Sequence, residues 1–185
     1  MGMAQNQRRI ALSAAAVLWS GVGGAAQADT KRVEAGDLLL NACIPAVAMA
    51  KPVKDLLPAG FDTLDGKAAG ALGFSGGGWS YGPPGPDRVV IGIRGERCLA
   101  MGFKGSNPAA AVTALEASAR TAHVALSMTS DGSGAGPATH QRDYLVRAEG
   151  ALPVLLSIRY PEKGGAFMGV VRPMLERVAP PLIAR

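Results

Sequence analysis

The first 28 residues most constrain what this chain can fold into, because they decide which part of it folds and in which compartment. Arg8 and Arg9 precede a short apolar run over residues 10–19, and the segment ends in an Ala-Gln-Ala sequence at Ala28. A basic start, a short apolar centre and an A-x-A ending are typical of a secretory signal peptide. We therefore expect residues 1–28 to be cleaved and residues 29–185 to form a single mature domain in the periplasm or outside the cell.

Two alternatives accompany this interpretation. The apolar run could form a buried N-terminal helix, but it is shorter than the roughly 20 apolar residues of a membrane-spanning helix and it precedes the A-x-A ending. The arginine pair at Arg8 and Arg9 also matches part of the twin-arginine export pattern. The residues that follow the pair match it incompletely, so general secretion fits better.

An exported chain with two cysteines is expected to oxidise them. Cys43 and Cys98 are the only cysteines of the sequence. An even cysteine count in an oxidising compartment indicates a disulfide. The alternative is a catalytic thiol, for which His123 and His140 would be the available partners. Two cysteines and two histidines without close spacing do not form a zinc pattern, so we expect no metal site and no cofactor.

The charge of the mature chain is small. Two of the 19 basic residues lie in residues 1–28, so 17 basic and 14 acidic residues remain and the net charge is +3. Nucleic-acid-binding surfaces need clustered basic residues with interleaved aromatic side chains, and the mature sequence has no basic run longer than a pair. No second apolar stretch is long enough to cross a bilayer. We therefore expect neither nucleic-acid binding nor an integral membrane segment in the mature chain.

Hydrophobic periodicity divides the mature chain into helices and strands. Residues 33–50 have helical spacing, interrupted by Pro45, and a second helix is predicted from Asn107-Pro108 to about Leu126. A β-branched run and its return predict a hairpin, and three further alternating runs predict a meander. These predicted strands are 88–94, 97–103, 142–149, 153–160 and 166–172.

The expected fold class is α+β. Its antiparallel sheet has about five strands, the element order is α-β-β-α-β-β-β, and the helices pack on one side. This order resembles the profilin-like and PAS-like layout of two strands, a helical connection and three strands. Residues 66–86 contain eight glycines and three prolines, so we expect a surface loop with a short extended piece at Trp79–Tyr81. Residues 129–140 are expected to form a second loop.

One motif suggests catalysis. Residues 73–77 read Gly-Phe-Ser-Gly-Gly and match G-x-S-x-G, in which hydrolases expose a nucleophilic serine between a strand and a helix. Ser75, Asp131 and His140 also occur in the chain order of such a triad. The surrounding sequence does not fit, because the preceding residues are rich in alanine and glycine and the following Gly/Pro sequence cannot form a helix. A plain loop is therefore the favoured interpretation of this motif.

Two aromatic residues are the other candidates for a site. Trp79 and Tyr81 lie in the Gly/Pro-rich loop, and loop aromatics can stack on a ligand or dock a partner. The alternative, which the sequence favours, is that Trp79 folds back to cover the sheet. His123, late in the second helix, is interpreted as a partner of the helix C-terminal dipole.

These observations predict an exported, non-enzymatic binding or accessory protein whose partner is an unidentified protein or small ligand. The first alternative is a small serine hydrolase built on Ser75. The second is an inhibitor or assembly factor whose target binds the Gly/Pro-rich loop at residues 66–86.

Overall fold

The computed structural model of the chain describes residues 33–85, 87–102, 108–133, 138–162 and 165–174. All of these residues belong to one compact unit. The expected signal peptide at residues 1–28, and Asn107 at the expected start of the second helix, lie outside the described residues.

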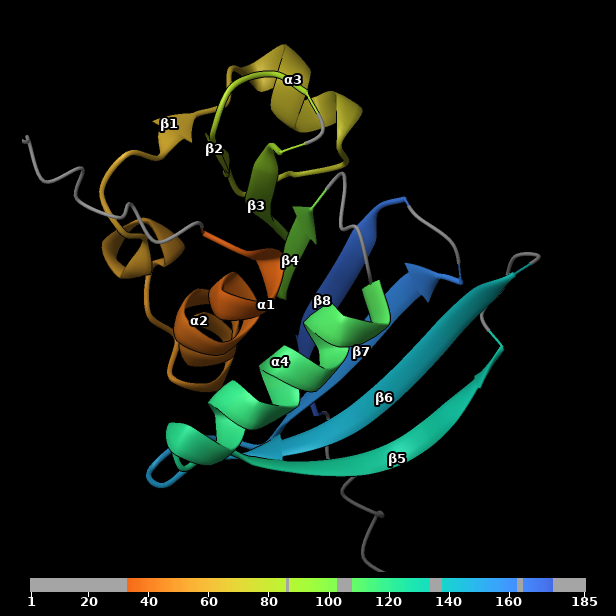
Figure 1. The fold of residues 1–185 in the computed structure, drawn as a ribbon. Coiled ribbons are helices and arrows are strands. Elements are labelled where there is room, and N and C mark those ends of the chain that lie inside the picture. Colours follow the sequence, from red (N-terminus) through yellow and green to blue (C-terminus); the bar gives the residue numbers. More distant parts are fainter. Residues whose placement is uncertain (1–32, 86, 103–107, 134–137, 163–164, 175–185) are drawn as a thin grey trace, which may run out of the picture. The chain divides into compact units, whose positions relative to one another are not determined.

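Eight antiparallel strands form one sheet, in the spatial order β1-β2-β3-β4-β8-β7-β6-β5 (Figure 1). The sheet consists of two consecutive four-stranded meanders, which meet where β4 pairs with β8. The strands are β1 Asp62–Thr63, β2 Gly78–Tyr81, β3 Val89–Arg94, β4 Arg97–Gly102, β5 Ala125–Ser133, β6 Thr139–Arg147, β7 Val154–Pro161 and β8 Phe167–Pro173.

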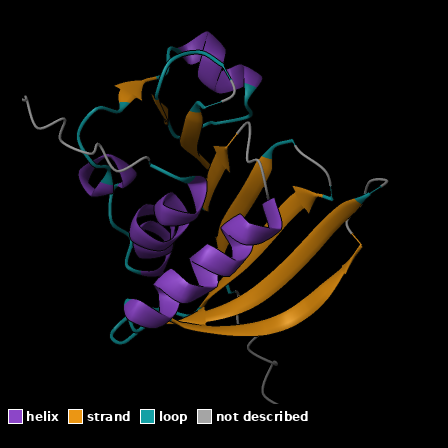
Figure 2. Ribbon diagram, viewed as in Figure 1, coloured by secondary structure: helices purple, strands orange, loops and turns teal. Residues whose placement is uncertain are grey.

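Helices precede and connect the two meanders (Figure 2). The N-terminal helical segment is continuous, and a π-helical turn precedes Pro45, which lies in the first turn of α2 where its missing N–H costs little. The helical elements are α1 Ala35–Leu38, η1 Leu39–Cys43, α2 Ile44–Ala48, the 3₁₀ turn η2 Val53–Leu56, α3 Gly66–Ala71 and α4 Pro108–Thr121.

The main core lies between one face of the sheet and the segments α1, η1, α2 and α4. Strands β3, β4, β6, β7 and β8 supply alternate residues to this face, as the period of two requires. On β7, residues Val154, Leu156, Ile158 and Tyr160 are all buried, as the alternation of side chains along a strand requires.

A second, smaller core lies on the opposite face. Phe74, just after α3, packs against Val90 and Leu99 together with Ala69 of α3. A Cβ at Gly92 would overlap the Phe74 ring, so the absence of a side chain there lets the ring lie on β3.

The expected α+β class with an antiparallel sheet is confirmed, and the strand count is corrected from about five to eight. The three additional strands are β1, β2 and β5. Four strands, not three, follow α4, so the profilin-like and PAS-like order is matched only in part. The helices are also not confined to one side, because α3 belongs to the second core.

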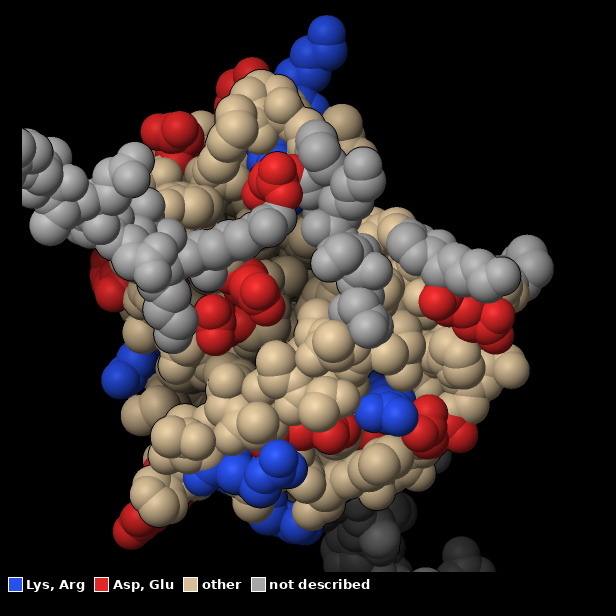
Figure 3. Space-filling model, viewed as in Figure 1, with Lys and Arg blue, Asp and Glu red and all other residues tan. Residues whose placement is uncertain are grey.

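A polar network holds α4 to the outer strands. The Tyr144 hydroxyl donates a hydrogen bond to Glu116 Oε1 of α4 at 2.6 Å, and Arg142 Nη1 lies 3.4 Å from the same oxygen. Arg142 Nε also bonds Asp131 Oδ2 of β5 at 3.1 Å. Figure 3 shows acidic and basic groups interspersed on this side of the molecule. The network joins α4, β5 and β6 through four side chains.

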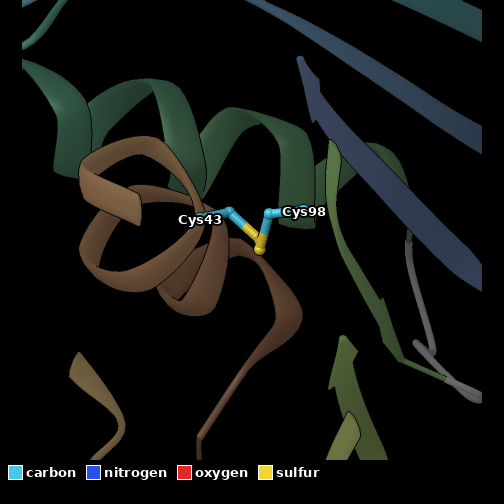
Figure 4. The surroundings of a disulfide bond; sticks show 2 residues. All are labelled: Cys43 and Cys98. Carbon is cyan, nitrogen blue, oxygen red and sulfur yellow. A yellow bond between two sulfur atoms is a disulfide. The ribbon is translucent and has the colours of Figure 1, made fainter. Parts of the chain in front are cut away.

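A disulfide joins Cys43 of η1 to Cys98 of β4, as Figure 4 shows and as the sequence predicts. Both cysteines are fully buried in the main core. No free cysteine remains, so the alternative of a catalytic thiol is wrong. The bond fixes the N-terminal helical segment to the centre of the sheet.

Candidate functional site

An open cleft of about 720 Å³ lies between the N-terminal helical segment and the β2–β3 part of the sheet. Residues 46–47 of α2 and residues 50–54 form one wall. Trp79 of β2, Ile93 of β3 and the Gly95-Glu96 turn form the other, and Gly76 and Pro173 complete the lining. Ligand pockets of proteins span roughly 300–1,000 Å³ and are mainly apolar. The cleft has the size and the lining of such a pocket.

The first wall is held in place by Val53. This side chain is only 4% exposed and belongs to the main core, whereas Lys51 and Lys54 on either side of it are exposed. Pro52, with φ of −62°, sets the extended backbone that leads into η2. Anchoring Val53 therefore fixes the backbone from which both lysines extend at the cleft.

The second wall is built around Trp79. On β2, Gly78 and Ser80 are buried towards the second core, so Trp79 lies on the opposite face, in register with Ile91 of β3. The indole is half-buried against the main core. A Cβ on Gly77 would lie 3.2 Å from the indole ring, so this glycine leaves room for it. Trp79 thus covers the sheet, as its favoured interpretation predicts, and also lines the cleft.

Tyr81 has a different environment. Its ring packs against Phe61 with 5.3 Å between centroids, and it does not line the cleft. The structure therefore separates the two aromatic residues that the sequence analysis grouped as one candidate site.

The charged groups of the cleft are Lys51, Lys54 and Glu96, and all three are exposed. None of them forms an ion pair with another residue in the part of the chain that the structure describes. The described lining contains no histidine, cysteine, serine or tyrosine. This arrangement offers apolar contact and charge to a ligand.

Ser75 lies outside this lining, at the end of the β3–β4 hairpin. Its backbone N–H donates to Ile93 O at 2.9 Å, and its Oγ accepts a hydrogen bond from the Gly95 N–H at 3.1 Å. The hydroxyl oxygen thus fastens the segment after Phe74 to the hairpin turn.

The other two members of the candidate triad are far from Ser75. In the sheet order, four inter-strand steps of about 4.8 Å separate β3 from β6, which is roughly 19 Å. His140 also lies at the opposite end of the sheet, where it pairs with Tyr160, stacks on that ring and lies 3.5 Å from Glu162. Asp131 bonds Arg142 instead. A general base must reach the nucleophile within hydrogen-bond distance, so these three residues do not form a catalytic unit.

The glycines of the G-x-S-x-G match have packing roles. Gly73 has φ of +75°, and a Cβ on Gly76 would lie 2.7 Å from the Ile93 side chain. These constraints let the chain turn after α3, insert the buried Phe74 and then approach β3 closely. The motif therefore has a structural explanation that is independent of catalysis.

No group of three His, Cys, Asp or Glu side chains in the described ranges could hold a metal ion. Among the helices of that same part of the chain, none is both long and apolar enough to cross a membrane.

Among the residues that line the cleft, the sequence indicates Trp79 but not the three charged residues. Lys51, Lys54 and Glu96 come from two other segments, and nothing in their local sequence indicates a shared site. The one available signal is the Lys-Pro-Val-Lys sequence at residues 51–54, where lysines flank an apolar residue just after a helix.

Comparison of the chain with protein-family models, with curated proteins and with solved structures gives no match. Its function is therefore argued from the geometry of the cleft.

Proposed function

We propose that this chain is an exported, non-enzymatic binding protein that holds a small ligand in the Trp79 cleft. Export is supported by the basic start, apolar run and A-x-A ending of residues 1–28 and by the buried disulfide. Binding is supported by the half-buried Trp79 beside an open, mainly apolar cleft of about 720 Å³. This last observation carries the proposal.

The residues around Ser75 favour binding over hydrolysis. The Ser75 oxygen accepts the Gly95 N–H, and the nearest members of a triad lie across the sheet. A serine without a base at about 3 Å is a weak nucleophile. We therefore expect a fluorophosphonate probe to leave Ser75 unlabelled. Labelling of the wild-type protein that disappears in Ser75→Ala would instead favour the alternative of a serine hydrolase.

The binding proposal is tested with phenylnaphthylamine, an uncharged dye whose fluorescence rises in apolar sites. We expect saturable binding to the purified protein. Trp79→Ala should weaken the binding at least fivefold, because the indole supplies the largest flat surface of the cleft. Ala46→Trp should weaken it similarly, because the added ring occupies the cleft from the α2 wall.

Tyr81→Ala is the matched control. It removes a half-buried aromatic ring from the same strand, and that ring packs on Phe61 outside the cleft. We expect this variant to bind the dye like the wild-type protein. Circular dichroism and a thermal unfolding curve establish that each variant is folded. Absence of saturable binding, or equal loss in Tyr81→Ala and Trp79→Ala, would overturn the proposal.

A further inference from the structure

We propose that the Trp79 cleft selects an anionic ligand, with a flat apolar body lying against Trp79 and a negatively charged group at Lys51 and Lys54. This inference rests on the proposed function and adds the chemical class of the ligand. The evidence for it is the charge of the cleft, where two lysines and one glutamate lie beside the apolar residues of the lining.

The two lysines are held at the cleft by their position in the chain. They flank Pro52 and the buried Val53, so the backbone between them is fixed by the main core. Both ammonium groups are exposed and lack an ion-pair partner among the described residues. Two unpaired ammonium groups that extend from a fixed backbone beside an apolar surface suit a carboxylate, sulfonate or phosphate.

The negative charge on the other wall of the cleft does not cancel the positive charge of the two lysines. Glu96 is the single acidic residue of the described lining, so two positive charges face one negative charge. Arg94 and Arg97 flank the same turn, and they form a cross-strand pair one position beyond Ile93 and Cys98. Since Ile93 and Cys98 face the main core, the two arginines lie on the opposite face of the sheet. The cleft itself is therefore net positive by one charge.

The apolar part of the ligand follows from the remaining lining. Trp79 presents a flat ring face, and Ile93, Val47 and Ala46 add aliphatic surface. Flat ligands gain most from an indole because stacked rings interact beyond the area that they bury. An open cleft of about 720 Å³ accommodates a small amphipathic anion.

The test compares two dyes that share one aromatic framework. Anilinonaphthalene sulfonate carries a negative charge, and phenylnaphthylamine does not. We expect the anionic dye to bind about five- to tenfold more tightly at low salt, because each exposed ammonium group contributes modestly and both act together. Raising the salt concentration should remove most of this preference and leave the uncharged dye unaffected.

Variants then show which residues cause the preference for the anionic dye. Lys51→Ala/Lys54→Ala should weaken binding of the anionic dye by a much larger factor than binding of the uncharged dye, so that the preference for the anionic dye is lost. Glu96→Gln should tighten the anionic dye about twofold, because it removes the opposing charge. Lys67→Ala, an exposed lysine of α3 outside the cleft, is the matched control and should change neither dye.

The outcomes separate this inference from the proposed function. Equal affinity for both dyes, each lost in Trp79→Ala, overturns the charge selectivity and leaves the binding function standing. No binding of either dye overturns both.

Discussion

Gly169 lies midway along β8 at the point where Leu39 packs on the sheet. A Cβ at this position would overlap the Leu39 side chain, which is fully buried. Ala100 and Ile158 are the cross-strand neighbours of Gly169 on either side. The missing side chain thus makes the hollow that Leu39 fills.

Gly169→Ala is therefore expected to lower the free energy of unfolding by about 1–3 kcal/mol through overpacking. Urea unfolding measures the change. Gly132→Ala is the control, because Gly132 also lies in a strand but a Cβ there meets nothing within 4 Å. In a Leu39→Ala background, Gly169→Ala should lower the free energy of unfolding by less, because the side chain that the added methyl group would overlap is absent. Equal stability of Gly169→Ala and the wild-type protein would contradict this account.

His123 follows α4 in a left-handed conformation, with φ of 56°. After α4 ends at Thr121, the Val124 N–H donates a hydrogen bond back to Ala119 O at 2.9 Å. The left-handed conformation of His123 thus turns the chain out of the helix. Glycine adopts this conformation without a Cβ penalty. We expect His123→Gly to stabilise the fold by about 1 kcal/mol, which corresponds to a rise of about 2–4 °C in Tm. The neighbouring Ala122→Gly should not raise Tm, and a rise in both variants would contradict the conformational explanation.

At the scale of elements, the disulfide is the covalent connection between the helical segment and the sheet. Its two cysteines are 55 positions apart in the sequence. Closing a loop of this length removes enough unfolded-state entropy to stabilise the fold by about 4 kcal/mol. We expect Cys43→Ala/Cys98→Ala to lose that amount in urea unfolding and the reduced wild-type protein to lose a similar amount. Two thiols that label in the denatured, unreduced protein would be inconsistent with the bond.

The contact between α4 and β6 has a pH dependence of its own. Burial of Tyr144, together with its hydrogen bond to Glu116 and the negative charge of that carboxylate, raises the pKa of the phenol, and Arg142 only partly opposes this. Below pH 10.0, the ordinary tyrosine value, the phenol is protonated in both states. Above it, the unfolded chain loses the proton while the folded protein keeps it, so the folded state becomes less stable as the pH rises.

We therefore expect wild-type protein to lose more stability between pH 9 and pH 11, a window around the ordinary tyrosine pKa, than Tyr144→Phe does. Urea unfolding at both pH values measures the difference. Glu116→Gln should give an intermediate slope, because it removes the charge and keeps an acceptor oxygen. Identical slopes for the wild-type protein and Tyr144→Phe would rule out this role for Tyr144.

The sequence predicts those elements whose own residues are buried in a regular pattern. The β3–β4 hairpin and strands β6 to β8 follow from alternating β-branched and apolar residues. Residues 125–126 of β5 fall in the second predicted helix and residues 129–133 in the second predicted loop, because the residues from Ala125 to Ser133 are mainly small and polar. The strand conformation of β5 comes from pairing with β6, which no local pattern reveals.

The Gly/Pro-rich stretch at residues 66–86 is a second segment whose secondary structure depends on tertiary contacts. The short extended piece expected at Trp79–Tyr81 corresponds to β2, whereas α3 was not expected. Asp65 caps α3 by accepting the Ala68 N–H at 2.7 Å, and an aspartate before an alanine-rich run is a signal that the sequence does contain. The cleft could be predicted only through Trp79, because its two walls come from segments that are distant in the sequence.

At the scale of the whole molecule, export predicts a defined covalent product. We expect the protein recovered outside the cytoplasm to begin at Asp29 and to contain 157 of the 185 residues. Intact-mass analysis of the exported protein measures this directly. Replacing the residues before the cleavage site, Ala26 and Ala28, with larger residues should leave the precursor uncleaved. A mature mass that still includes residues 1–28 would refute the assignment.

The pairing of β4 with β8 also affects how fast the protein folds. It joins residues 97–102 to residues 167–173 at the centre of the sheet, so the two meanders cannot unite before nearly all of the chain is available. Sheets dominated by such distant pairings fold slowly, because the entropy of closing the loop is lost before the contacts form. General secretion, which residues 1–28 favour over the twin-arginine route, requires an unfolded chain. On this proposed route, the late pairing of β4 with β8 favours folding only after the last strand has emerged on the far side.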